Sequence, residues 1–164
     1  MPLPKRDWDA KKVTYPNTDS AIRWMQGRYR WLSRQFPGYQ VPHGEHAPYK
    51  TIEHYLQVER THPVDRPRAA QYQHARELRA AFKTGRLRQR DDWAAVRDKV
   101  MWEALCYKFS LNSPDQQLRL NLLSTYPRIT LIVDSNPGCE NYWGSCVCPL
   151  PTCRNTGQNV YGRM

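Results

Sequence analysis

Hydrophobic residues recur at helical spacing in the middle of the chain. Between residues 49 and 59, Ile52, Tyr55 and Leu56 fall on one side of a helix. Thr51 stands just before them, where a threonine can cap a helix by accepting a hydrogen bond from a backbone N–H. The pattern predicts a helix over residues 49–59.

Five more segments have patterns typical of regular structure. Residues 92–109 form the strongest helical stripe, with Asp92 able to cap it. Residues 113–125 open with Ser113 as an N-cap and a proline at the first helical position. Similar reasoning predicts helices over residues 68–83 and about 19–30, and a strand over residues 129–133. The expected fold is α+β and mainly helical, a single compact domain with short strands.

One charged residue interrupts the apolar stripe of residues 92–109. Lys108 projects within this stripe rather than opposite it. A lysine in such a position either extends its ammonium group to solvent or meets an anion, because a buried charge without a partner is unfavourable. The sequence leaves both alternatives open, and the anion would be a phosphate or a carboxylate of the site.

The chain is strongly basic. Twenty-five Lys and Arg against fifteen Asp and Glu give a net charge of +10, which favours partners that carry phosphate, although a basic surface can also serve solubility alone. No apolar run approaches the roughly 18–20 residues that span a bilayer, and residues 1–14 lack the hydrophobic region of a signal peptide. We expect a cytoplasmic protein with no membrane partner.

The cysteines do not resemble the framework of a secreted disulfide protein. Cys106 falls within a helical pattern, and the other four crowd into a short stretch: Cys139, Cys146, Cys148 and Cys153. Four thiolates could hold a structural zinc ion, but the common C-x2-C spacing is absent, so free thiols in a loop are the alternative. No other metal or cofactor is expected.

Two carboxylates lie among aromatic and amide side chains, one in residues 51–57 and one in residues 140–144. Such surroundings suit a site that holds a ring-shaped substrate while a carboxylate helps to break a bond. Glu53 and Gln57 stack one turn apart on the predicted helix. Glu53 also falls in the first helical turn, where the helix dipole favours its charged form. A first-turn glutamate can equally serve helix stability alone.

Six segments, in this order and approximate spacing, resemble the NADAR (YbiA-like) family: 27–33, 49–57, 92–110, 122–125, 142–144 and 157–159. The resemblance implies a mainly helical α+β domain over residues 27–164, with residues 1–26 as an extension packed on it. It also implies hydrolysis of N-glycosidic bonds. The family's substrates are phosphorylated ribosylamino-pyrimidine intermediates of riboflavin synthesis, or ADP-ribose attached to guanine in nucleic acid.

The resemblance suggests a role for each candidate site residue. Breaking a C1′–N bond builds positive charge on the ribose, so the site needs an anion near C1′. Glu53 is the first choice for that role, and Glu140 is the second catalytic candidate. The remaining candidates would bind the substrate: Trp31, Ser33, Arg34, Gln57, Lys108, Trp143 and Asn159. The two tryptophans would stack on a base or simply pack in the core, and Arg34 and Lys108 would neutralise phosphates.

The chain also departs from the family pattern. Arg34 stands where the family usually has asparagine, and Glu140 where it has aspartate. The segment between Gly144 and Gly157 is longer than in the simplest members, and the terminal helix is short. These changes keep a non-catalytic ADP-ribose or nucleic-acid binding module open as an alternative.

The preferred function is removal of ADP-ribose from guanine in nucleic acid. A protein with a charge of +10 binds nucleic acid favourably, because binding releases counterions from the phosphates. The expected partner is therefore a nucleic acid or nucleotide that bears ADP-ribose. Arg76, Arg79 and Lys83 share a face of the predicted 68–83 helix, and we expect them on a solvated or DNA-facing surface.

Overall fold

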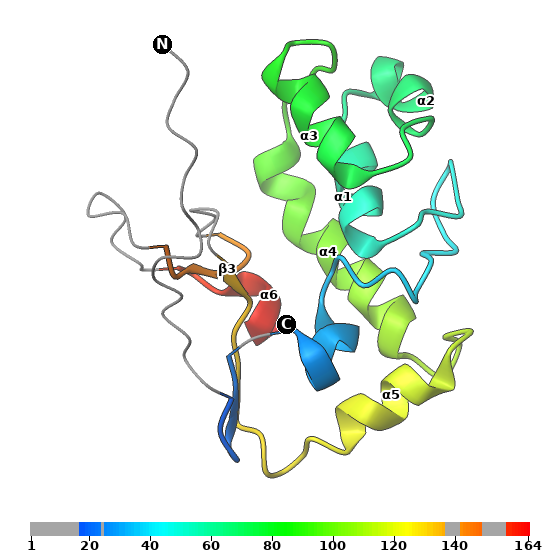
Figure 1. Cartoon of the computed structure of the whole chain (residues 1–164). Helices are drawn as coiled ribbons and strands as arrows, with labels where there is room; N and C mark the ends of the chain where they lie inside the picture. The colour runs from blue at the N-terminus through cyan, green and yellow to red at the C-terminus, as the bar shows by residue number, and fades with distance from the viewer. Residues whose placement is uncertain (1–16, 24, 137–141, 149–156) are drawn as a thin grey trace. The chain divides into compact units, whose positions relative to one another are not determined.

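Helices dominate the computed structural model, which describes residues 17–23, 25–136, 142–148 and 157–164 (Figure 1). The chain divides into two units, one of residues 30–125 and one that joins residues up to 29 with residues 126–164. The first unit is helical, and the second contains the short strands. The α+β, mainly helical fold predicted from the sequence is confirmed.

Four helices build the unit of residues 30–125: α1 (Ile52–Arg60), α3 (Ala75–Lys83), α4 (Trp93–Phe109) and α5 (Gln116–Leu123). Helix α1 packs against both α3 and α4, and α4 packs against α5. Ile52 and Leu56 of α1, Leu78 of α3 and Met101 of α4 are fully buried between them. Thr51 caps α1, since its hydroxyl accepts a hydrogen bond from the His54 N–H (3.0 Å), as predicted.

The helix predicted over residues 68–83 is interrupted. A 3-10 turn η2 (Pro63–Asp65) leads into the short α2 (Arg66–Ala69), and α3 begins only at Ala75. The Glu77 carboxylate accepts hydrogen bonds from the backbone N–H groups of Gln73 (3.1 Å) and His74 (3.2 Å). These bonds satisfy donors at a new helix start, so the chain begins a second helix there instead of continuing the first.

The N-cap predicted at Ser113 is wrong, and Asp92 occupies its predicted N-cap position without capping the helix through its side chain. Helix α5 is capped by Asp115, which accepts from the Gln117 N–H (3.0 Å), and not by Ser113. The Gln116 side chain donates to the Ser113 carbonyl (2.7 Å), which fixes the preceding turn outside the helix. At the start of α4, the Asp92 side chain makes no capping bond and pairs with Arg90 instead.

The predicted helix over residues 19–30 is also wrong. Residues Ala21–Ile22 form strand β1, and a 3-10 helix η1 (Gly27–Leu32) follows. Strand β1 pairs in parallel with β2 (Leu131–Ile132), so Ile22 lies opposite Ile132. Backbone hydrogen bonds to a segment more than a hundred residues away thus override the local periodicity. Strand β2 confirms the strand predicted over residues 129–133, although it is shorter.

Close backbone packing holds the end of the chain. Strand β3 (Ser135–Asn136) pairs in parallel with β4 (Ser145–Cys146), and α6 (Val160–Arg163) follows. The Tyr161 N–H donates to the Trp143 carbonyl (2.9 Å). A Cβ atom on Gly157 would overlap the Gly144 carbonyl oxygen, so glycine is required for this approach.

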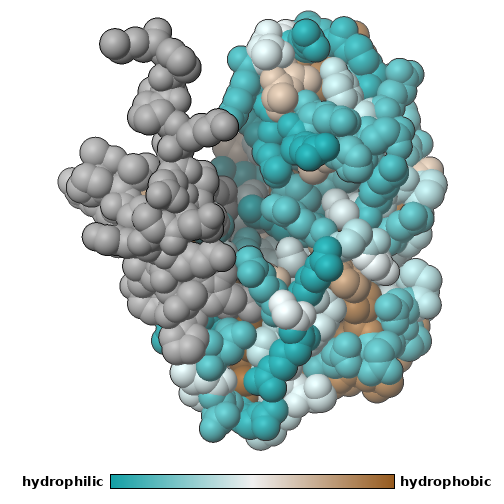
Figure 2. All heavy atoms as spheres, in the orientation of Figure 1, coloured by the Kyte–Doolittle hydropathy of each residue, from teal (hydrophilic) through white to brown (hydrophobic). Residues whose placement is uncertain are grey.

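Hydrophobic side chains gather at the surface around α5 (Figure 2), where Leu111, Leu120 and Leu123 are all exposed. Hydrophilic residues cover most of the remaining coloured surface in this view. Among the residues that the structure describes, no helix is long and apolar enough to span a bilayer.

Candidate functional site

Glu53 is a buried carboxylate held by three side chains. It lies in the first turn of α1 and is 3% exposed. Its Oε2 atom lies 2.9 Å from the Arg34 Nε atom, and its Oε1 atom accepts a hydrogen bond from Arg79 Nη1 at 2.7 Å. The Gln57 amide donates to the same Oε1 atom at 3.0 Å. Two cations and an amide thus converge on one carboxylate, and charge-assisted hydrogen bonds hold it in place.

Local structure explains why Glu53 lies against Arg34. The capping of α1 by Thr51 leaves the Glu53 N–H free of intrahelical bonds, and this N–H donates to the Arg34 carbonyl at 2.9 Å. The contact anchors the segment after η1 to the start of α1. Arg34 is therefore held to Glu53 through both its backbone and its side chain.

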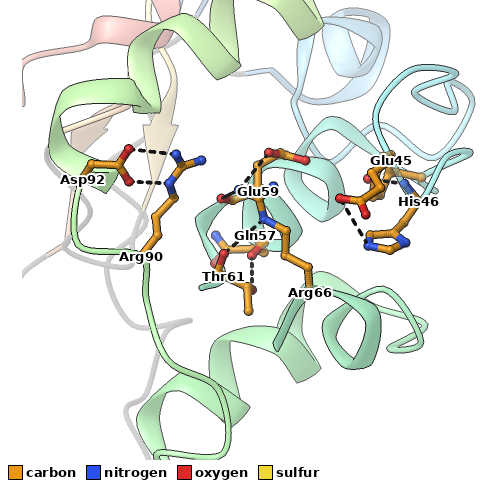
Figure 3. Close-up of polar contacts among 9 residues, drawn as sticks. Glu45, His46, Gln57, Glu59, Thr61, Arg66, Arg90 and Asp92 are labelled. Carbon is orange, nitrogen blue, oxygen red and sulfur yellow. Dashed lines mark hydrogen bonds and ion pairs between the residues drawn. The ribbon is translucent and has the colours of Figure 1, made fainter. Parts of the chain in front are cut away.

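Gln57 extends the site by one helical turn, as the spacing predicted. Its backbone carbonyl accepts the Thr61 hydroxyl (2.9 Å), and the neighbouring Arg66 reaches Glu59 (Figure 3). The Gln57 Oε1 atom is buried, yet no described residue donates a hydrogen bond to it. A buried acceptor without a donor is unfavourable. This atom is suited to accept a hydrogen bond from a ligand hydroxyl or amine.

Arg79 contacts the site, although the sequence predicted only a solvated or DNA-facing position for it. Its side chain is 41% exposed, but its guanidinium reaches across from α3 to Glu53. The contact follows from the packing of α3 on α1. One feature of the sequence could have indicated this contact: Arg79 lies beside Leu78 and Phe82, at the edge of the inner face of α3.

Lys108 is buried and meets neither solvent nor a carboxylate. It is 1% exposed, and its Nζ atom donates to the Ser33 carbonyl at 3.2 Å. The ammonium also lies 5.5 Å from the ring centre of Phe36 and 5.3 Å from that of Phe109. Burial lowers the pKa of Lys108 to about 7. Near neutral pH the side chain can therefore carry a charge or offer a free amine.

The segment after η1 connects these groups. The Trp31 ring meets Phe109 edge-on, with ring centres 6.1 Å apart. The Ser33 hydroxyl accepts the Gln35 N–H (3.1 Å), and the Ser33 carbonyl accepts Lys108. Six predicted site residues are thereby brought together within one unit: Trp31, Ser33, Arg34, Glu53, Gln57 and Lys108. Their catalytic and binding roles stay predictions.

The other predicted site residues belong to the second unit. Trp143 is buried, with its ring edge-on to Tyr142. Asn159 adopts a left-handed backbone conformation, and its amide accepts the Asp134 N–H (3.0 Å) and donates to the Ile132 carbonyl (2.8 Å). Asn159 therefore ties α6 to the region of β2, and its predicted contact with substrate stays a prediction.

Glu140, Cys139 and Cys153 lie outside the described residues, so the second carboxylate and the zinc prediction stay open. Cys146 and Cys148 are buried, and the Cys148 N–H donates to the Cys146 sulfur at 3.3 Å. Within the described ranges, no group of three or more His, Cys, Asp or Glu could hold a metal ion.

Comparison with known proteins decides the family. The NADAR domain matches residues 20–164. The chain belongs to the NADAR domain family. The solution NMR structure of the E. coli protein YbiA has the same fold, with a TM-score of 0.68 and 22% sequence identity, over 94% of this chain and 85% of that chain. No curated protein matches the sequence. Membership connects this NADAR chain with a family of N-glycosidase-like proteins.

Proposed function

We propose that this protein is an N-glycosidase that removes ADP-ribose from ADP-ribosylated guanine in nucleic acid. The observation that carries the proposal is Glu53, a buried carboxylate between two arginines and beside an amide oxygen that lacks a donor among the described residues. This carboxylate faces positive charge from Arg34 and Arg79. The oxocarbenium-like ribose of N-glycoside cleavage would present positive charge to the same group.

In the proposed reaction, the C1′–N bond breaks and its electron pair goes to the guanine nitrogen. Water adds to C1′ and a proton passes to the base, which gives free ADP-ribose and unmodified guanine. Glu53 would stabilise the charged ribose, and Gln57 Oε1 would accept a ribose hydroxyl. Arg79 is half-exposed and can turn from Glu53 to a phosphate of ADP-ribose.

Lys108 would contribute in either protonation state. The ammonium can bind phosphate, as the sequence suggested, while the free amine can accept a proton from the attacking water. A pKa near 7 makes both forms available at neutral pH. The Ser33–Arg34 peptide joins Lys108 to the Arg34–Glu53 pair.

The ion pair between Arg34 and Glu53 favours a second candidate, a module that binds ADP-ribose without cleaving it. Arg34 replaces the usual asparagine of the family and lies 2.9 Å from the carboxylate. A cation held in this position can oppose the build-up of positive charge on a ribose. The same cation would strengthen binding of the substrate's phosphates.

One substrate panel separates these functions. The protein is incubated with an oligonucleotide that carries ADP-ribosylated guanine, and released ADP-ribose is measured by mass spectrometry. A phosphorylated ribosylamino-pyrimidine is tested in parallel. Release from the oligonucleotide that depends on Glu53 supports the proposal. Binding without release favours the non-catalytic module, and cleavage of only the pyrimidine favours the riboflavin-type activity.

A further inference from the structure

Cations are concentrated in the segment formed by α3 and the residues that follow it. Residues 75–90 contain one acidic residue within α3, Glu77, and six basic residues: Arg76, Arg79, Lys83, Arg86, Arg88 and Arg90. Three of these have carboxylate partners, because Arg79 pairs with Glu53, Arg88 with Asp65, and Arg90 with Asp92.

The side chains of Arg76 and Lys83 are exposed and make no hydrogen bond or ion pair with any described residue. The two lie seven residues apart, which on a helix is two turns and about 10 Å along the axis. They therefore share the outer face of α3. We call this pair the α3 stripe.

Helix stability does not account for both members of the stripe. Lys83 lies in the last turn of α3, where a cation interacts favourably with the helix dipole. Arg76 lies in the first turn, where a cation is unfavourable and where Glu77 already supplies the favourable charge. An external anion would explain a cation in that position.

We infer that the α3 stripe binds the phosphate backbone of the nucleic-acid strand that carries the modified base. The inference rests on the proposed function. Arg79 lies between Arg76 and Lys83 on the same helix, and its guanidinium reaches Glu53. A strand whose modified base enters at Glu53 therefore passes the stripe, which spans the rise of about three phosphates along a strand, at about 3.4 Å each.

The test separates binding of the strand from chemistry at the site. Arg76→Gln/Lys83→Gln removes the stripe. Lys99→Gln/Arg119→Gln is the matched control, because it removes two charges from α4 and α5 in the same unit. Each protein is assayed for cleavage of an ADP-ribosylated guanine oligonucleotide and of the corresponding mononucleotide. Fluorescence anisotropy measures binding of an unmodified labelled 12-nucleotide strand at several salt concentrations.

We expect the stripe variant to lose about tenfold in affinity for the strand and in kcat/KM for the oligonucleotide, while cleavage of the mononucleotide is unchanged. The slope of log affinity against log salt should fall by about 1.4, or about 0.7 for each lost phosphate contact. The control should change affinity less than twofold.

Three results would overturn the inference. Equal losses in the stripe and control variants would show only an effect of net charge. An equal loss on the mononucleotide would place the stripe at the site itself. Unchanged binding of the strand by the stripe variant would show that the stripe does not contact nucleic acid. If neither substrate is cleaved by the parent protein, the proposed function fails, and the anisotropy result still decides whether the stripe binds nucleic acid.

Discussion

Two buried carboxylates in the unit of residues 30–125 each lie between two arginines, and they differ in what surrounds them. Asp65 is 8% exposed and pairs with Arg68 and Arg88, whose side chains are 58% and 61% exposed. It also accepts the Arg88 backbone N–H at 3.2 Å. Glu53, by contrast, has a buried arginine as one partner and shares its position with Gln57, whose Oε1 lacks a donor among the described residues.

This comparison shows that an arginine–carboxylate–arginine arrangement does not by itself mark a site. Around Asp65, the backbone bond and the solvent-exposed arginines satisfy the carboxylate and fasten the segment after α3 to η2. The hydrogen bond from the Arg88 side chain holds the pKa of Asp65 below its ordinary value. Around Glu53, the buried Gln57 Oε1 atom receives no hydrogen bond from the described residues, and the buried Lys108 donates to the Ser33 carbonyl. The unsatisfied buried group, rather than the number of charges, distinguishes the candidate site.

The largest expected difference between the two carboxylates is in catalysis. Glu53→Gln should lower kcat for ADP-ribose release by about a thousandfold, because it removes the charge that stabilises the ribose cation. Asp65→Asn should stay within about threefold of the parent, since Asp65 serves the fold. Mass spectrometry of released ADP-ribose gives the rates, and thermal unfolding confirms that both variants fold. Equal losses of kcat in the two variants would show that the two carboxylates do not differ in catalysis.

Lys108→Met tests the comparison further, because it removes a buried amine from the surroundings of Glu53 and leaves those of Asp65 unchanged. We expect kcat to fall about a hundredfold. In the parent, the pH dependence of kcat should show an inflection near pH 7, the pKa of Lys108, and the variant should lack it. A variant that retains both the rate and the inflection would contradict a role for this lysine in proton transfer.

The same variant has a stability effect whose sign follows from the lowered pKa. Between about pH 7 and pH 10, the unfolded lysine binds more protons than the folded one, so the stability of the parent rises with pH. Lys108→Met should therefore be more stable than the parent at pH 6, by a gap about 4 kcal/mol larger than at pH 10, because one pKa unit corresponds to about 1.4 kcal/mol. The gap should narrow as pH approaches 10. Urea unfolding at several pH values measures it, and a gap that does not change with pH would contradict the lowered pKa.

Arg34→Asn introduces the asparagine that the family resemblance implies at this position, and it removes the buried partner of Glu53. Removing one member of a buried ion pair should cost about 3 kcal/mol of unfolding free energy. The cost should exceed that of Arg88→Gln, because Arg88 is mostly exposed. If the non-catalytic candidate is correct, Arg34→Asn should gain ADP-ribose release that the parent lacks. Urea unfolding and the release assay measure the two effects.

Arg79→Gln should have a smaller effect on stability. This arginine is 41% exposed, so solvent screens its ion pair with Glu53 and the loss should be below about 1 kcal/mol. If Arg79 turns to a substrate phosphate, KM should rise about fivefold with little change in kcat. A fall in kcat with unchanged KM would instead show that Arg79 positions Glu53.

The parts of the fold that could be predicted are those governed by near neighbours in the chain. The Thr51 cap, the Glu53–Gln57 pair and the length of α4 follow from spacings of three and four residues. The predictions over residues 19–30 and 68–83 failed because other contacts prevailed. A parallel pairing with β2 decided the first, and the capping of His74 by Glu77 decided the second.

The features of the candidate site can be separated in the same way. The amino-acid sequence by itself determined that Glu53 begins a helix, that Gln57 lies one turn above it, and that Lys108 falls on an apolar face. Only the tertiary structure decided which groups these side chains meet. Packing of α3 on α1 brings Arg79 to Glu53, and burial of α4 places Lys108 against the Ser33 carbonyl. Helical periodicity defines the face on which a side chain lies, whereas its partners depend on long-range packing that no local pattern encodes.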